Sequence, residues 1–177
     1  AEFGAGPAIA LLSSRGARVD YVVTTDGGKG TEDPDVTPAQ LSATRQAEQR
    51  AAADILGVTD IVHLGYPDGY LTPSLDVRRD ITRQIRRFRP DLVITQNPQR
   101  RLDHNPFIGH PDHLATGEAT LAAVYPAGRH PPNPLTPASL VAGAGLFTMQ
   151  GRAVRDYVEA VVPDLLGTVV KESGATL

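Results

Sequence analysis

Three short apolar segments, separated by helix-like patterns, constrain the fold of this chain more than any other feature. Strands are predicted over residues 19–24, 60–64 and 91–95, where apolar and β-branched residues follow one another almost without interruption. An alternating order of strands and helices implies right-handed crossovers, which give a mostly parallel sheet with helices on both of its sides. The sequence therefore predicts a single α/β domain of Rossmann-like type over residues 1–177.

The helical segments carry their own start and stop signals. Helices are predicted over residues 7–14, from Pro38 to residue 57 with Thr37 as N-cap, from Ser74 to just before Pro90, and over residues 114–125. In the last two, the expected packing faces are formed by Val77, Ile81, Ile85 and Phe88, and by Leu114, Gly117, Leu121 and Val124. Beyond residue 126 the sequence predicts a proline-rich surface loop, a strand within 141–147 and a helix within 152–162.

The helix that begins at Pro38 has an unusual stripe. Leu41, Ala52 and Ile55 form its expected core face, and Arg45 and Glu48 occupy positions between them. A solvated ion pair would normally lie on the opposite face of the helix. We therefore expect this pair to point inward, or toward the rim of a site.

Composition narrows the class of protein. The formal net charge is −3, which gives no general attraction to nucleic acid or to acidic membranes. An arginine-rich stretch, residues 78–89, opposes the apolar stripe of its helix and is interpreted as a solvated face. The sequence contains no apolar run of membrane-spanning length and no visible signal peptide, so a cytoplasmic location is expected. With no cysteine in the chain, any metal must be bound by nitrogen and oxygen ligands.

Polar side chains follow each predicted strand. Asp26, Asp68 and Asn97 lie in the loops after the three strands, and a histidine-containing segment follows the last of them. In open α/β sheets, ligands bind outside the carboxyl ends of the strands, so these loops should meet at one edge. The sequence has neither a Gly-x-Gly-x-x-Gly loop after a strand nor a Walker A motif, which argues against dinucleotides and nucleoside triphosphates. A metal and a polyhydroxylated small molecule suit this set of residues better.

The most informative segment is His110-Pro111-Asp112-His113, at the entry to the last predicted helix. Histidines three residues apart project from nearly the same side of a helix turn. That spacing suits a metal ligand beside a second, non-ligating imidazole. The alternative is that these histidines simply lie exposed in a loop. Asp112 also occupies a position at which it could act as a helix N-cap.

Taken in order along the chain, several short motifs resemble the PIG-L/LmbE family of zinc-dependent N-deacetylases. The matching pieces are Ala1-Glu2-Phe3-Gly4-Ala5-Gly6, Thr25-Asp26-Gly27, Arg45 with Glu48 and Ala51-Ala52, Leu56-Gly57, Pro67-Asp68-Gly69, Asn97-Pro98, and His110-Pro111-Asp112-His113 with Gly117. The resemblance implies an LmbE-like fold. It also implies that a first strand and a His-Pro-Asp-Asp motif precede Ala1, so that two zinc ligands and the general base have no counterpart in residues 1–177.

The resemblance further implies roles for individual residues. His113 would be a metal ligand, and His110, supported by Asp112, would stabilise the oxyanion formed when a metal-activated water attacks an acetamide. Arg45 and Asp68 would bind sugar hydroxyls, with Asn97 and Asp26 as further substrate-binding candidates.

The expected function is hydrolysis of the acetyl group of an N-acetylated amino sugar or its conjugate, with Zn²⁺ or another divalent cation as cofactor. The expected partner is a small amino-sugar substrate, with neither nucleic acid nor membrane, and with homo-oligomer formation as an open prediction. Two alternatives remain: a non-catalytic relative that binds a sugar or a nucleotide-like ligand, and a structural or oligomerising remnant of the family.

Overall fold

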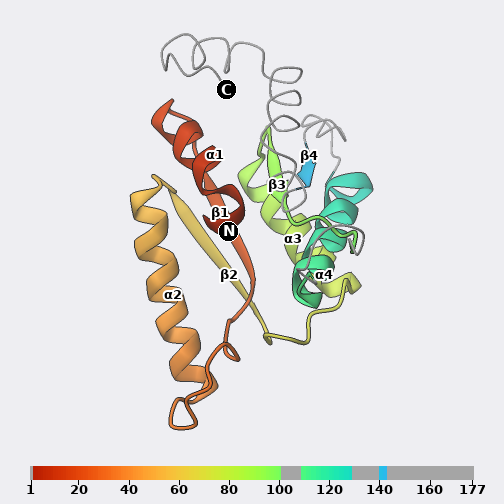
Figure 1. Cartoon of the computed structure of the whole chain (residues 1–177). Helices are drawn as coiled ribbons and strands as arrows, with labels where there is room; N and C mark the ends of the chain where they lie inside the picture. Colours follow the sequence, from red (N-terminus) through yellow and green to blue (C-terminus); the bar gives the residue numbers. More distant parts are fainter. Residues whose placement is uncertain (1, 101–108, 129–139, 143–177) are drawn as a thin grey trace.

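The structure of the chain is a computed structural model, and it describes residues 2–100, 109–128 and 140–142. Helices and strands alternate along the chain, as the sequence predicts (Figure 1). In chain order the elements are α1 (Glu2–Ser14), β1 (Asp20–Thr25), α2 (Pro38–Ile55), β2 (Asp60–Tyr66), α3 (Leu75–Phe88), β3 (Val93–Thr95), α4 (Pro111–Ala122), the π-helical turn η1 (Ala123–Ala127) and β4 (Leu140–Ala142).

The strands form two parallel pairs, β1 with β2 and β3 with β4. Asp20 lies opposite Asp60 at the start of the first pair, and the register shifts between Val23 and Thr25 near its end. The long helix α2 lies along one side of this pair, and α3 and α4 lie on the other (Figure 1). The prediction of an α/β fold with parallel strands and flanking helices is confirmed, because each crossover carries a helix.

Element boundaries differ from those expected by a few residues. Strand β2 continues to Tyr66 instead of ending at residue 64, and β3 begins at Val93 instead of residue 91. Strand β4 covers the start of the predicted 141–147 strand. The predicted helix over 152–162 and most of the proline-rich loop lie outside the described residues. The extent of a single domain over 1–177 therefore stays a prediction.

Helix α2 starts as expected and packs differently from what was expected. Thr37 accepts from the N–H of Gln40, and the Gln40 side chain accepts from the N–H of Thr37, which completes a capping box. Ala53 is fully buried, whereas Ile55 is 87% exposed, so the predicted inclusion of Ile55 in the core stripe is wrong. Leu41 and Ala53 are twelve residues apart, which places them about 120° apart around the helix, so the buried positions do not form one narrow stripe.

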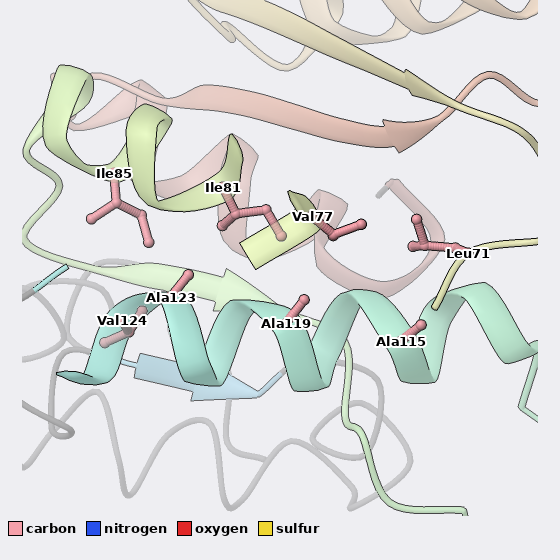
Figure 2. Packing of buried hydrophobic residues seen from close by; sticks show 8 residues of the cluster. All are labelled: Leu71, Val77, Ile81, Ile85, Ala115, Ala119, Ala123 and Val124. Atoms are coloured by element: carbon pink, nitrogen blue, oxygen red, sulfur yellow. The ribbon is translucent and has the colours of Figure 1, made fainter. Parts of the chain in front are cut away.

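Within the described residues, two hydrophobic clusters hold the elements together. The larger one joins α3 to α4, with Leu71 from the preceding loop at one end (Figure 2). Its members are Leu71, Val77, Ile81, Ile85, Ala115, Ala119, Ala123 and Val124. Because α4 presents mainly alanines, its backbone can lie close to α3. The predicted α3 stripe is confirmed except for the half-buried Phe88, and on α4 the alanines replace Leu114 and Leu121 as the buried positions.

The second cluster joins α1, β1 and α2. It contains Ala5, Ile9, Tyr21, Ala53 and Val58, with Ile94 of β3 packed against it. This cluster fixes β1 and the first helix relative to each other.

The outer face of α3 is polar, as predicted. Arg79 and Arg83 pair with Asp80, and Arg87 pairs with Asp60 at 3.1 Å. All three arginine side chains are more than half exposed, so these ion pairs contribute little to stability. No helix in the described part of the chain is long and apolar enough to cross a membrane.

Candidate active site

The candidate site is built around the first turn of α4. His110 is the N-cap of this helix, and Pro111 occupies the first helical position. The His110 Nδ1 accepts a hydrogen bond from the N–H of Asp112 at 3.3 Å. Because Nδ1 accepts in this contact, Nε2 is the ring nitrogen that can donate to a ligand. The alternative in which Asp112 is the N-cap is wrong, because His110 is the N-cap and the helix begins at Pro111, two residues earlier than an Asp112 cap would require.

The two histidines of the segment lie side by side. Their ring centroids are 5.6 Å apart with the planes tilted by 50°. The N–H of His113 donates to the carbonyl of His110 at 3.0 Å, which closes the first turn and fixes this spacing. The predicted pair of neighbouring imidazoles is therefore present at the N-terminus of α4.

The environment of His113 favours its neutral form. Its pKa is lowered first by partial burial and then by electrostatic interaction with the neighbouring His110, while Asp112 and Asp68 act in the opposite direction. The side chain still retains substantial solvent exposure. A neutral imidazole with accessible surface has a lone pair free to bind a metal or to accept a proton.

Asp112 binds the loop between β2 and α3. The residue is 3% exposed, and its two carboxylate oxygens accept from the N–H groups of Gly69 at 2.7 Å and Leu71 at 3.1 Å. These loop contacts could not be foreseen from the sequence, because the partners lie about forty residues away. The expected support of His110 by the Asp112 carboxylate stays a prediction.

Asp26 and Asp68 tie together the loops that follow β1 and β2. The Asp26 carboxylate accepts from the N–H groups of Gly28 at 3.0 Å and Asp68 at 3.1 Å. The Asp68 carboxylate in turn accepts from the N–H of Lys29 at 3.2 Å. The two loops are therefore fastened to each other by reciprocal bonds, and the expected convergence of Asp26 and Asp68 at one edge is observed.

Arg45 lies at the edge of the same loops. Its side-chain stem lies beside Gly27, where an added Cβ would be 3.4 Å from the Arg45 Cγ. Arg45 forms an ion pair with Glu48, and both side chains are about half exposed. The pair does not point inward, so that part of the prediction is wrong. Its contact with Gly27 does place Arg45 at the rim.

Asn97 follows β3 and packs near α4. Its side-chain oxygen accepts from the N–H of Gln99 at 2.9 Å, which stabilises a turn. The backbone on either side of Asn97 lies against Gly117 of α4. The loop is therefore close to the helix that carries the histidines, while the side chain of Asn97 bonds within its own turn.

A further link joins β1 to α4. The hydroxyl groups of Thr24 and Thr116 are hydrogen-bonded at 2.9 Å, between half-buried and buried positions. Neither threonine was singled out from the sequence. Their only signal is the position of Thr24 at the carboxyl end of a predicted strand.

The described residues do not make up a zinc site on their own. Over 2–100, 109–128 and 140–142, no group of three or more His, Asp or Glu side chains is arranged to hold a metal. A catalytic zinc has three protein ligands. His113 offers one nitrogen donor, whereas Asp112 already accepts two N–H groups. The described part of the chain therefore supplies one candidate ligand, His113, and a complete metal site needs further donors.

Comparison with known proteins gives a consistent group of relatives. The family model described as PIG-L, GlcNAc-PI de-N-acetylase, matches residues 1–124, a range that includes every candidate site residue named above. The chain is 37% identical over 125 residues to a diacetylchitobiose deacetylase of Thermococcus kodakarensis, a match that covers 71% of the chain and 45% of the relative. It is 34% identical over 122 residues to a probable N-acetyl-alpha-D-glucosaminyl L-malate deacetylase 2 of Bacillus anthracis, a match that covers 66% of the chain and 50% of that protein.

A solved structure supports the same grouping. The N,N'-diacetylchitobiose deacetylase of Pyrococcus horikoshii, determined with an inhibitor, superposes with a TM-score of 0.68 at 29% identity. The match covers 93% of the chain and 71% of that structure. The chain spans about half the length of the curated relatives it matches.

Proposed function

The chain belongs to the PIG-L family, and we propose that it forms part of a hydrolase that removes the acetyl group from an N-acetylated amino sugar or its conjugate. The observation that carries this proposal is the pair of imidazoles on the first turn of α4, next to the loops that follow β1 and β2. The relatives named above are deacetylases of N-acetylated sugars by their descriptions. N,N'-diacetylchitobiose and an N-acetylglucosaminyl conjugate are accordingly the first substrates to test.

His110 is proposed to stabilise the oxyanion. Since its Nδ1 accepts from the helix backbone, its Nε2–H can donate to the acetamide oxygen as negative charge develops there. The donor is held by a helix N-cap, so little reorganisation is needed during the reaction. The helix N-terminus itself also favours negative charge.

The substrate is proposed to lie between the loops and α4. Arg45 and Asp68 would bind hydroxyl groups of the sugar, with Asp26 and Asn97 as further contacts. The hydrogen bonds of Asp26 to the loop backbone support a second function for it, which is to hold the Asp68 loop in place.

A divalent cation, Zn²⁺ in the first instance, remains part of the proposal through His113. When bound, such an ion would supply an activated water. Titration of the chain with Zn²⁺ tests whether His113 is a ligand. Any binding should disappear in His113→Ala and persist in His63→Gln, a control histidine on β2. Zinc binding that is identical in both variants would refute the role of His113.

Activity is tested by measuring release of free amine from N-acetylglucosamine and from N,N'-diacetylchitobiose by the full-length protein. His110→Ala should lower kcat by roughly a hundredfold or more, as expected for loss of an oxyanion donor, while His63→Gln retains activity. If the full-length protein releases no amine from any N-acetylglucosamine conjugate, the proposed function is refuted. Cytoplasmic location, homo-oligomer formation and the lack of a nucleic-acid partner stay predictions.

A further inference from the structure

Tyr70 is an exposed aromatic side chain beside the candidate site. It follows the Pro67-Asp68-Gly69 turn, and 69% of its surface is accessible. Isolated exposed aromatic residues are common on protein surfaces, so exposure alone indicates nothing. The surroundings of Tyr70 are what distinguish it.

The backbone around Tyr70 is fixed on both sides. The N–H groups of Gly69 and Leu71 donate to Asp112, and that of Tyr70 donates to the carbonyl of Pro67 at 3.3 Å. The Leu71 side chain is 6% exposed and packs into the α3–α4 cluster beside Ala115 (Figure 2). Leu71 is directed into the core, and three consecutive N–H groups are hydrogen-bonded. The backbone from which the Tyr70 side chain projects is therefore held in place.

The ring is also held from one side. The Lys29 ammonium lies 3.5 Å from the centroid of the Tyr70 ring, a cation–π contact. The Lys29 stem passes Gly69, and the Lys29 N–H donates to Asp68. Within the described residues, no other aromatic ring or cation packs on Tyr70. One face of the ring is therefore available to a ligand beside Asp68.

We propose that Tyr70 is a stacking platform for a second pyranose ring, joined to the sugar whose acetamide is hydrolysed. This inference rests on the proposed function and narrows the substrate class to a disaccharide or a similar two-ring conjugate. Pyranose rings have an apolar face of C–H groups that fits a flat aromatic ring, and their rim of hydroxyls suits Asp68 and Lys29 as polar partners. The bonds of Gly69 and Leu71 to Asp112 hold Tyr70 next to the turn that carries the histidines, and its exposed ring would contact the part of such a substrate that extends beyond the acetamide sugar.

Binding of one-ring and two-ring sugars to the chain separates this role from a structural one. N-acetylglucosamine and N,N'-diacetylchitobiose are titrated into wild type, Tyr70→Ala, Tyr70→Phe and Tyr125→Ala, with binding followed by NMR chemical shifts. Tyr125 is a matched control, because it is a 53% exposed tyrosine at the opposite end of α4. Saturation-transfer signals on the protons of each sugar ring report which ring contacts the aromatic side chain.

The expected result is that wild type prefers the disaccharide and that Tyr70→Ala weakens disaccharide binding by roughly fivefold. Monosaccharide binding should be unchanged, and Tyr70→Phe and Tyr125→Ala should keep the preference. If Tyr70→Ala keeps the preference, or weakens both sugars equally, the stacking role is refuted while the proposed function stands. If wild type binds neither sugar, the stacking role is refuted, and the proposed function is decided separately by amine release from the full-length protein.

Discussion

Replacing Gly117 by Ala tests how closely α4 is packed against the loop after β3. A Cβ at position 117 would lie 2.4 Å from the carbonyl oxygen of Gln96 and 3.0 Å from the nitrogen of Pro98. Both neighbours are backbone atoms, so neither can move aside by changing a side-chain rotamer. The first contact is about 1 Å shorter than ordinary van der Waals distances, which begin near 3.4 Å. Helix and loop must therefore separate by a similar amount.

Two opposing terms decide the size of the effect. Alanine is more favourable than glycine within a helix by about 0.5–1 kcal/mol. Overpacking of a closely packed interface typically costs about 1–3 kcal/mol. Because the contact at Gly117 is short and rigid, we expect the second term to dominate. The free energy of unfolding should fall by about 1–2 kcal/mol.

Urea denaturation measures this change, and Gly4→Ala in α1 is the matched control. A Cβ at Gly4 would have nothing within 4 Å, so this substitution should be neutral or stabilise the protein by up to about 0.5 kcal/mol. In the full-length protein, Gly117→Ala should also lower the rate of amine release, since the displaced helix carries His110 and His113. If Gly117→Ala is as stable as wild type, the tight contact does not exist as described and the reasoning is refuted.

Three further substitutions test other contacts. Tyr66→Phe removes a hydroxyl that donates to Asp80 at 2.7 Å and should cost about 1 kcal/mol at pH 7. This contact lowers the pKa of Asp80, so the stability it gives is present above the ordinary carboxyl range and is lost as the pH falls through the pKa of Asp80 in the folded protein. Urea denaturation at low pH should therefore show the stabilities of wild type and Tyr66→Phe converging. At the alkaline end, burial and then Asp80 raise the pKa of Tyr66 to about 12, so the difference should be fully present below the ordinary tyrosine pKa of 10.0 and be lost as the pH rises from there to about 12. Thr37→Ala removes the capping box of α2 and should cost about 1 kcal/mol in the same assay, with Thr37→Ser as the conservative control. Asp112→Asn leaves one of two loop N–H groups without a good acceptor and should cost about 1–3 kcal/mol, together with faster hydrogen exchange in that loop; unchanged exchange would contradict the loop-holding role.

The fold could be predicted from the sequence because its signals are local. The strands appear as short apolar runs, and Thr37 and Ser74 start their helices with side chains that accept backbone N–H groups. The spacing of apolar residues and the capping residues identify such elements from a few neighbouring positions in the sequence. The buried face of α2 was harder to place, since Ile55 is apolar and yet exposed. Which apolar residue is covered depends on where the neighbouring elements lie.

The candidate site could be predicted only in outline. The carboxyl-end rule brought Asp26, Asp68 and the histidine segment to one edge of the sheet, and the structure places them there. What each carboxylate binds could not be foreseen, because Asp112 finds its partners in a loop about forty residues earlier. Contacts between segments that are distant in sequence depend on how the elements pack. Neighbouring residues in a single sequence do not reveal them.

Helix α4 contacts the carboxyl end of β1 and the loops that follow β2 and β3. It does so through the Thr24–Thr116 hydrogen bond, the Asp112 contacts with the β2–α3 loop, and the close approach at Gly117. A substitution that shifts one of these three segments must therefore leave α4 in the position that the other two require. Substitutions in different loops should show non-additive effects on activity even where the loops do not touch each other. Engineering a new substrate preference into this site would accordingly require coordinated changes around α4. The exposed Tyr70 ring is a position that can be altered without removing the hydrogen bonds between its backbone neighbours and Asp112.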